Sequence, residues 1–229
     1  KTRFEGTGKL DRHNLGNLFL TFAQQYTGDF MSGVRALEQA VNAVGTVYPV
    51  TLDMNDLAVE LSNGETIVGE HEIDRPEHAG EHRITRAWLT PGPKLFDDAR
   101  KVIEEADYII LGPGSLYCSI VATLLPEGVR ESIEKSSAKI IYASGNAYEV
   151  DGEAGPTKLS ECVSELQLYL PRPIDYVVYN NHIFSEEESA HYNEKGWRPY
   201  EGDVGAITGP QVIAGDYERE FHYGSVTTG

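Results

Sequence analysis

Hydrophobic and polar positions follow a helical period in the first part of the chain. Residues 11–26 and 27–45 carry apolar side chains every three or four positions, which predicts two amphipathic helices. Gly45 is expected to end the second helix, because glycine readily adopts the left-handed conformation found after many helices. The candidate N-cap residues are His13 or Asn14 for the first helix and Thr27 or Asp29 for the second.

A strand pattern follows these helices. Residues 46–52 are predicted to form one strand, and residues 83–89 another. Between them, residues 57–73 form two alternating runs around Asn63 and Gly64, which predicts a hairpin because both residues tolerate a positive φ. This hairpin is expected to extend the main sheet or to form a small subdomain.

From residue 93 onward, short apolar runs alternate with helical patterns. Residues 108–111, 138–143 and 174–180 are β-branched and apolar, and a helix is predicted on each side of every run. This rhythm predicts βαβ units and a Rossmann-like, doubly wound and mainly parallel sheet with helices on both faces. We expect a single α/β domain over residues 1–229, with an irregular tail at 205–229 in which only residues 211–215 resemble a strand.

The charge of the chain restricts its partners. Nineteen basic and thirty-six acidic residues give the 229-residue chain a formal net charge of −17. Such a chain repels nucleic acid and anionic membranes, so neither is an expected partner. No run is apolar enough to span a membrane and no signal peptide is recognisable, which favours a cytoplasmic location. Cys118 and Cys162 are expected to be buried, reduced thiols.

Glycine and amide residues follow three consecutive predicted strands. The first strand ends in residues 112–115, Gly-Pro-Gly-Ser, the second in residues 144–146, Ser-Gly-Asn, and the third in residues 180–182, Asn-Asn-His. Ligands of open parallel sheets bind at the carboxyl ends of the strands, so these turns are expected to line one crevice. Ser115 is placed to cap the helix that starts at Leu116, which would leave backbone N–H groups directed at a phosphate. The alternative is a tight structural turn without a ligand.

A second group of donors lies at the start of the first helix. Asn14, Gly16 and Asn17 could approach the same ligand, or Asn14 could simply cap the helix. No candidate group is a good catalytic acid, base or nucleophile, and the seven histidines lack the spacing of a zinc site. The sequence therefore predicts no catalytic residue and no metal ligand.

Four motifs together resemble the CofD-like family. They are "HNLGNLFL", "TGDF", "ADYIILGPGSLYCSI" and "IDYVVYNN", with consistent spacing over residues 3–199. The family joins phospholactate transferases to YvcK-type gluconeogenesis factors, which bind UDP-sugars, and the first and third motifs are more similar to the YvcK-type branch. The resemblance implies a Rossmann-like sheet, a nucleotide diphosphate ligand and a homodimer.

The sequence also departs from the family pattern. The family's opening strand and its glycine-triplet loop are missing, so nucleotide affinity is expected to be weak unless another segment supplies them. After Asn146 only Gly152 and Glu153 match the family's loop, and Arg219 and His222 resemble its closing segment loosely. Tyr192 stands where the family has a tyrosine, and we expect it to contact the base or the sugar.

The resulting expectation is a nucleotide-sugar-binding protein with a regulatory role in carbon or cell-envelope metabolism. The alternative is a transferase of the phospholactate transferase type, which would use a divalent ion such as Mg²⁺ with the bound nucleotide. The expected nucleotide-binding residues are Asn14, Gly16, Asn17, Gly112, Pro113, Gly114, Ser115, Leu116, Asn146, Asn180, Asn181 and Tyr192.

Overall fold

The computed structural model of the chain describes residues 14–76 and 81–218. Contacts divide the chain into two compact units, Lys1–Leu52 and Asp53–Gly229, and each is described by itself. The expectation of a single domain over residues 1–229 stays a prediction.

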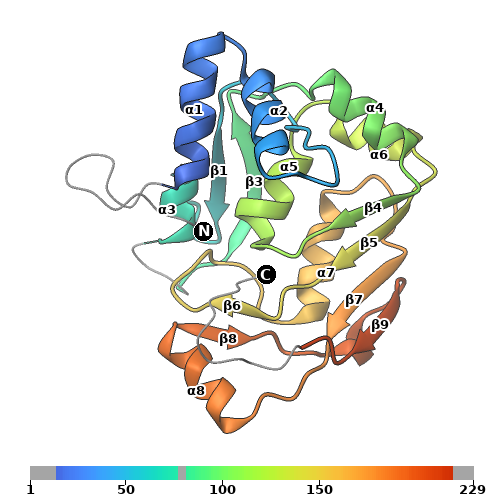
Figure 1. Cartoon of the computed structure of the whole chain (residues 1–229). Coiled ribbons are helices and arrows are strands. Elements are labelled where there is room, and N and C mark those ends of the chain that lie inside the picture. Colours follow the sequence, from blue (N-terminus) through green and yellow to red (C-terminus); the bar gives the residue numbers. More distant parts are fainter. Residues whose placement is uncertain (1–13, 77–80, 219–229) are drawn as a thin grey trace. The chain divides into compact units, whose positions relative to one another are not determined.

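The first unit contains two helices, α1 (Leu15–Thr27) and α2 (Phe30–Ala40) (Figure 1). Asn14 and Asp29 are their N-caps, as the sequence predicted. Helix α2 ends before Gly45, and the predicted strand over residues 46–52 is wrong, because no strand pairing forms there. Pro49 lies within that segment and has no N–H to donate to a neighbouring strand.

The second unit begins with an antiparallel sheet. Strands β1 (Asp56–Leu61), β2 (Thr66–Val68) and β3 (Ile84–Thr90) lie in the order β2-β1-β3. The Asn63–Gly64 turn joins β1 to β2, and Gly64 has a φ of 85° that favours glycine. The predicted hairpin is therefore confirmed for β1 and β2, and together with β3 it forms a sheet of its own. The second predicted run extended to Ile73, but the chain after β2 forms helix α3 (Glu70–Asp74) instead.

The second unit also contains a four-stranded parallel sheet. It contains β4 (Tyr108–Leu111), β5 (Lys139–Ala143), β7 (Tyr176–Asn180) and β9 (Gln211–Gly215) in the order β4-β5-β7-β9 (Figure 1). The predicted α/β class is confirmed. The strand-like piece expected in the tail is confirmed as well, because β9 pairs with β7 along its whole length.

Helices and short strands connect these elements. The helices are α4 (Asp97–Glu105), the π-helix η1 (Leu116–Val121), α5 (Ala122–Leu124), α6 (Val129–Lys135), α7 (Leu159–Leu168), α8 (Glu186–Glu194) and the 3-10 helix η2 (Val204–Ala206). The strands β6 (Ala147–Glu149) and β8 (Trp197–Pro199) pair with each other in an antiparallel ribbon.

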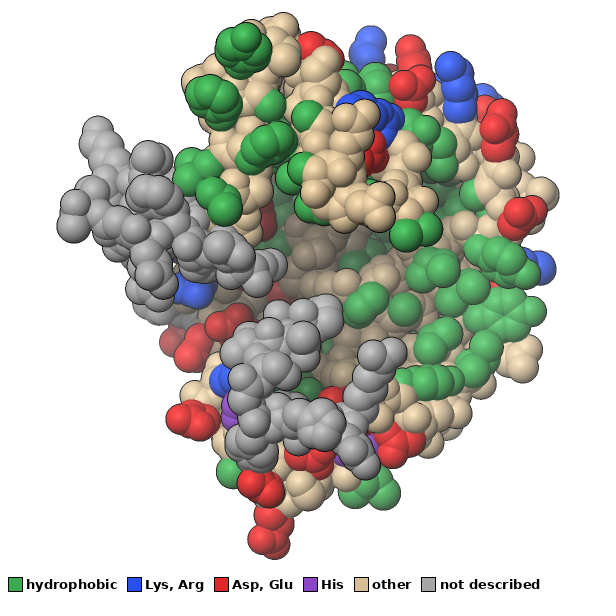
Figure 2. Space-filling view, viewed as in Figure 1, with side chains coloured by type: hydrophobic (Ala, Val, Ile, Leu, Met, Phe, Trp, Pro, Cys, Tyr) green, Lys and Arg blue, Asp and Glu red, His purple; other side chains and the backbone are tan. Residues whose placement is uncertain are grey.

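The two faces of the parallel sheet differ in burial. Ile140, Tyr142 and Val177 project to one face and are at most 3% exposed. Tyr108 and Ile110 of β4 project to the other face and are each 63% exposed. Figure 2 shows hydrophobic side chains gathered over this sheet, on the right of the view. The core of the unit therefore lies on one face of the sheet.

Candidate functional site

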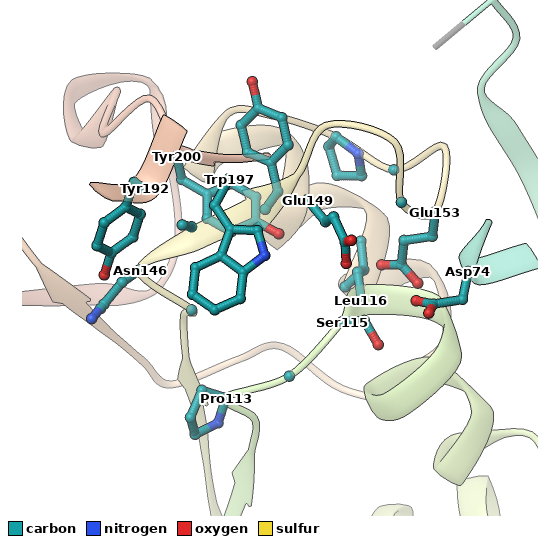
Figure 3. Close-up of a pocket in the computed structure, with 17 residues that line it drawn as sticks. Asp74, Pro113, Ser115, Leu116, Asn146, Glu149, Glu153, Tyr192, Trp197 and Tyr200 are labelled. Carbon is teal, nitrogen blue, oxygen red and sulfur yellow. The ribbon is translucent and has the colours of Figure 1, made fainter. Parts of the chain in front are cut away.

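A cavity of about 450 Å³ opens in the second unit at the carboxyl ends of β4 and β5 (Figure 3). The turn after β4, the residues after β5, and the β6–β8 ribbon contribute its walls. Its lining includes six of the predicted nucleotide-binding residues: Pro113, Gly114, Ser115, Leu116, Asn146 and Tyr192 of α8.

The turn at residues 112–115 requires both of its glycines. Gly112 has a φ of 91°, and a Cβ there would lie 2.5 Å from the carbonyl oxygen of Ala143. A Cβ on Gly114 would lie 3.0 Å from Cβ of Ser119. Any larger residue would thus push the turn away from β5 and from helix η1. Glycines are therefore needed at both positions because neighbouring atoms of the protein lie so close to the turn. Gly114 is exposed to solvent.

The start of helix η1 is occupied by a carboxylate of the same chain. The N–H of Tyr117 donates to both Glu153 oxygens, at 3.1 and 3.0 Å, and the N–H of Cys118 donates to Oε2 of Glu153 at 2.9 Å. The expectation that backbone N–H groups at the start of this helix are directed at a phosphate is therefore wrong for Tyr117 and Cys118. Glu153 takes the position at a helix N-terminus that an anion would otherwise prefer.

Ser115 is the N-cap residue of η1, as predicted, but its side chain makes no capping bond. Its Oγ lies 2.8 Å from Oγ of Ser119 instead. Within the described residues, the N–H groups of Gly114 and Ser115 donate to no protein acceptor. These two groups are the backbone donors that the turn can still offer to a ligand.

Carboxylates gather on one side of the cavity. Figure 3 shows Asp74, Glu149 and Glu153 on the side of Ser115 and Leu116, and the described lining contains no lysine or arginine. Burial raises the pKa of Glu153, although the N–H groups of Cys118 and Tyr117 oppose that shift. A bare polyphosphate would be repelled on this side, so a ligand's anionic part needs the N–H donors of the turn.

Aromatic rings form the other side of the cavity. Tyr192 and Trp197 meet edge to face with 5.9 Å between ring centroids, and Tyr148 and Tyr200 lie 5.4 Å apart. Figure 3 shows Tyr192 beside Asn146. Burial raises the pKa of Tyr192. Such a wall suits a planar base or the apolar face of a sugar.

The three predicted asparagines of the second unit are placed differently. Asn146 lines the cavity, and Nδ2 of Asn180 donates to its Oδ1 at 3.3 Å, so these two side chains form a pair. Asn181 is exposed and does not line this cavity. Its N–H donates to the carbonyl of Gly215 at 3.0 Å, which holds β7 beside β9.

The predicted residues at the start of the first helix belong to the first unit. Oδ1 of Asn14 accepts a hydrogen bond from the N–H of Gly16 at 2.9 Å, so Asn14 has the capping role that the sequence allowed. Asn17 is exposed, and its carbonyl accepts a hydrogen bond from Thr21. His13, Arg219 and His222 lie outside the described residues.

The cysteines are free thiols. Cys162 is buried and Cys118 is half-buried, and burial raises the pKa of both, to about 12 for Cys162. Such thiols are poor nucleophiles at neutral pH. In the described parts of the chain, no group of three or more His, Cys, Asp or Glu side chains is arranged to hold a metal ion. These residues therefore do not fit a Mg²⁺ site of their own.

Residues that sequence reasoning missed dominate the cavity. Glu153, Trp197, Tyr148 and Tyr200 were not among the predicted ligand-binding residues, and Glu153 was noted only as a match to the family's loop. That match was the available signal, since a glutamate retained in an otherwise altered loop indicates a specific contact.

The fold and the cavity define an α/β protein whose candidate site lies where the strands of a parallel sheet end. Residues 1–217 match the family described as 2-phospho-L-lactate transferase CofD. The chain therefore belongs to the CofD family. No helix among the described residues is both long and apolar enough to cross a membrane.

Curated relatives carry the name "Gluconeogenesis factor". The protein from Bacillus subtilis is 33% identical over 208 residues, which are 88% of this chain and 63% of the relative. The protein from Halalkalibacterium halodurans is 37% identical over 141 residues, which are 61% of this chain and 42% of the relative. The chain thus spans less than two thirds of the length of these relatives.

A solved protein from Bacillus halodurans has a similar structure. Its TM-score to this chain is 0.84 at 29% identity, and the match covers 94% of this chain and 69% of the solved chain. This similarity agrees with the Rossmann-like sheet that the strand pattern predicted.

Proposed function

We propose that the chain binds a nucleotide-sugar, of the UDP-sugar type, in the cavity at the carboxyl ends of β4 and β5. In this proposal the protein acts as a regulator in carbon or cell-envelope metabolism and works in the cytoplasm as a homodimer. The observation that carries the proposal is a cavity of about 450 Å³ with an aromatic wall beside an open glycine turn. This volume lies within the range of small-molecule sites, about 300–1,000 Å³.

The two sides of the cavity suit the two ends of such a ligand. The rings of Trp197 and Tyr192 offer faces and edges to a base or a sugar. The N–H groups of Gly114 and Ser115, which have no acceptor among the described residues, are the donors for a pyrophosphate oxygen. Main-chain N–H donors can bind an anion without the help of a basic side chain. Such donors are needed here because the lining of the cavity is acidic and, among the described residues, has no lysine or arginine.

A transferase activity is the second candidate. It is favoured by the description of the matching family, 2-phospho-L-lactate transferase CofD. In that case the chain would position a nucleotide-linked phospho-organic acid beside an acceptor hydroxyl, and positioning would supply most of the rate enhancement. Because the described residues do not form a metal site, no step through Mg²⁺ is assigned to them.

A thermal-shift panel of uridine and guanosine nucleotides and their sugars, with and without Mg²⁺, tests the proposal. We expect UDP-sugars to raise the melting temperature, and Ser115→Glu to abolish that rise because a new carboxylate would repel the pyrophosphate. The matched control is Ser164→Glu, which places the same charge on an exposed position of α7.

The outcomes separate the candidates. A rise that Ser115→Glu retains in full would contradict the assigned site, provided that its circular dichroism spectrum matches that of the wild type. Protection by a UDP-sugar without consumption of the nucleotide supports the binding protein. Release of a nucleoside monophosphate or diphosphate in the presence of an acceptor supports the transferase.

A further inference from the structure

A short segment after β9, residues 216–218, lies against the carboxyl ends of β5 and β7; we call it the strap. Its last residue, Glu218, places a carboxylate on the asparagine pair. Oε2 of Glu218 accepts hydrogen bonds from Nδ2 of Asn146 at 3.2 Å and from Nδ2 of Asn180 at 3.1 Å. Two neutral donors, one in the bend after β5 and one at the end of β7, thus converge on one oxygen of the same chain.

The strap is fastened to the second unit at two further points. The N–H of Tyr217 donates to Oδ1 of Asn180 at 3.1 Å. Both carboxylate oxygens of Asp216 lie 3.1 Å from Nδ1 of His182. Nε2 of the same imidazole lies 3.2 Å from Oε1 of Glu188 in α8. His182 therefore joins the strap to α8.

The strap makes its contacts at the edge of the cavity. Asn146 lines the cavity, and its side chain lies beside Tyr192 (Figure 3). Asn180, at the end of β7, is hydrogen-bonded to Asn146. Each asparagine directs an NH₂ group at Glu218, so whatever replaces Glu218 must be an acceptor. A carboxylate is the group that these donors hold now.

We infer that the asparagine pair is a subsite for an acidic group of the ligand, and that Glu218 fills it as an intramolecular competitor. The identity of the rest of the ligand rests on the proposed function, but the subsite and its competitor do not. An acidic group can bind the pair only in molecules whose strap has moved aside. The measured affinity is then reduced by the fraction of molecules in that open state.

Side-chain amide NMR with malonate, a small dicarboxylate, tests the subsite directly. The ¹⁵N-labelled wild type, Glu218→Ala and Glu187→Ala are each titrated while the NH₂ signals of Asn146 and Asn180 are followed. Glu187→Ala is the matched control, because it removes one charge from an exposed position of α8 whose side chain makes no hydrogen bond with another described residue.

We expect malonate to shift both NH₂ signals of Glu218→Ala at a concentration lower by about fivefold or more than in the wild type and in Glu187→Ala. Equal concentrations in Glu218→Ala and the control would overturn the inference. Equal concentrations would mean that Glu218 affects malonate binding only through the net charge of the protein and does not compete for the asparagine pair.

UDP-glucose, titrated into the same three proteins, separates this inference from the proposed function. Failure of UDP-glucose to bind any of them, with the malonate difference intact, would refute the nucleotide-sugar and leave the subsite standing. Binding of UDP-glucose without a malonate difference would refute the subsite alone.

Discussion

At the scale of single residues, Glu153 determines what the glycine turn can bind. Its carboxylate already holds the N–H groups of Tyr117 and Cys118 at the start of η1. The sequence correctly indicated that donors gather after β4. It could not show that a residue 35 or more positions later would occupy part of them, because that contact depends on the path of the loop after β6.

Glu153→Ala should therefore create a stronger site for inorganic phosphate. Removing the carboxylate frees two N–H groups at a helix N-terminus, where an anion is favoured. Thermal denaturation with increasing phosphate checks this, and Glu149→Ala is the matched control, because Glu149 lines the same cavity without bonding η1. We expect phosphate to raise the melting temperature more in Glu153→Ala than in Glu149→Ala. An equal rise in both variants would show that only charge matters.

His182 should make the strap sensitive to pH. The carboxylate of Asp216, and then that of Glu188, raise its pKa above the usual 6.5, and the ring of Phe184 packs edge-on against it. Because the folded-state pKa is raised, the stabilising effect of the protonated imidazole is complete below about pH 6.5 and is lost as the pH rises through the raised pKa.

An NMR titration of the His182 ring checks this prediction. We expect a pKa above that of histidine in a model peptide, and the NH₂ signals of Asn146 and Asn180 should move over the same pH range as the strap loosens. A His182 pKa at or below 6.5 would contradict this prediction. So would NH₂ signals of Asn146 and Asn180 that do not change as His182 titrates.

At the scale of elements, the parallel sheet shows how far the apolar pattern can be read. The runs that became β4, β5 and β7 were recognised because each is short, apolar and β-branched. Their unequal burial was not recognisable, because a continuous apolar run does not reveal which face is covered. The segment 46–52 was assigned wrongly, since its β-branched composition outweighed Pro49 in the prediction.

The two faces of the sheet predict different costs for the same substitution. Ile140 is fully buried, whereas Ile110, on the neighbouring strand, is 63% exposed. Ile140→Val should lower the free energy of unfolding by about 0.5–1.5 kcal/mol, because it removes a buried methylene and leaves a space. Ile110→Val should change it by less than about 0.5 kcal/mol. Urea denaturation measures both, and equal losses would mean that both faces are covered in solution.

At the scale of the whole molecule, the net charge of −17 and the acidic side of the cavity pose one electrostatic problem. An anionic ligand gains little from long-range attraction, so short-range donors must supply its affinity. The sequence made this problem visible through composition. The short-range donors are the N–H groups of Gly114 and Ser115, which have no acceptor among the described residues, and the asparagine pair bound to Glu218. They could be recognised only from the folded structure, in which the strand ends lie together.

Amide NMR with UDP-glucose is the sharpest test of ligand binding in this cavity, because it locates the ligand on the whole molecule at once. We expect the N–H signals of Gly114 and Ser115 and the indole signal of Trp197 to shift together and to saturate at one ligand concentration. Saturable shifts elsewhere in the chain, with these three signals unmoved, would contradict it.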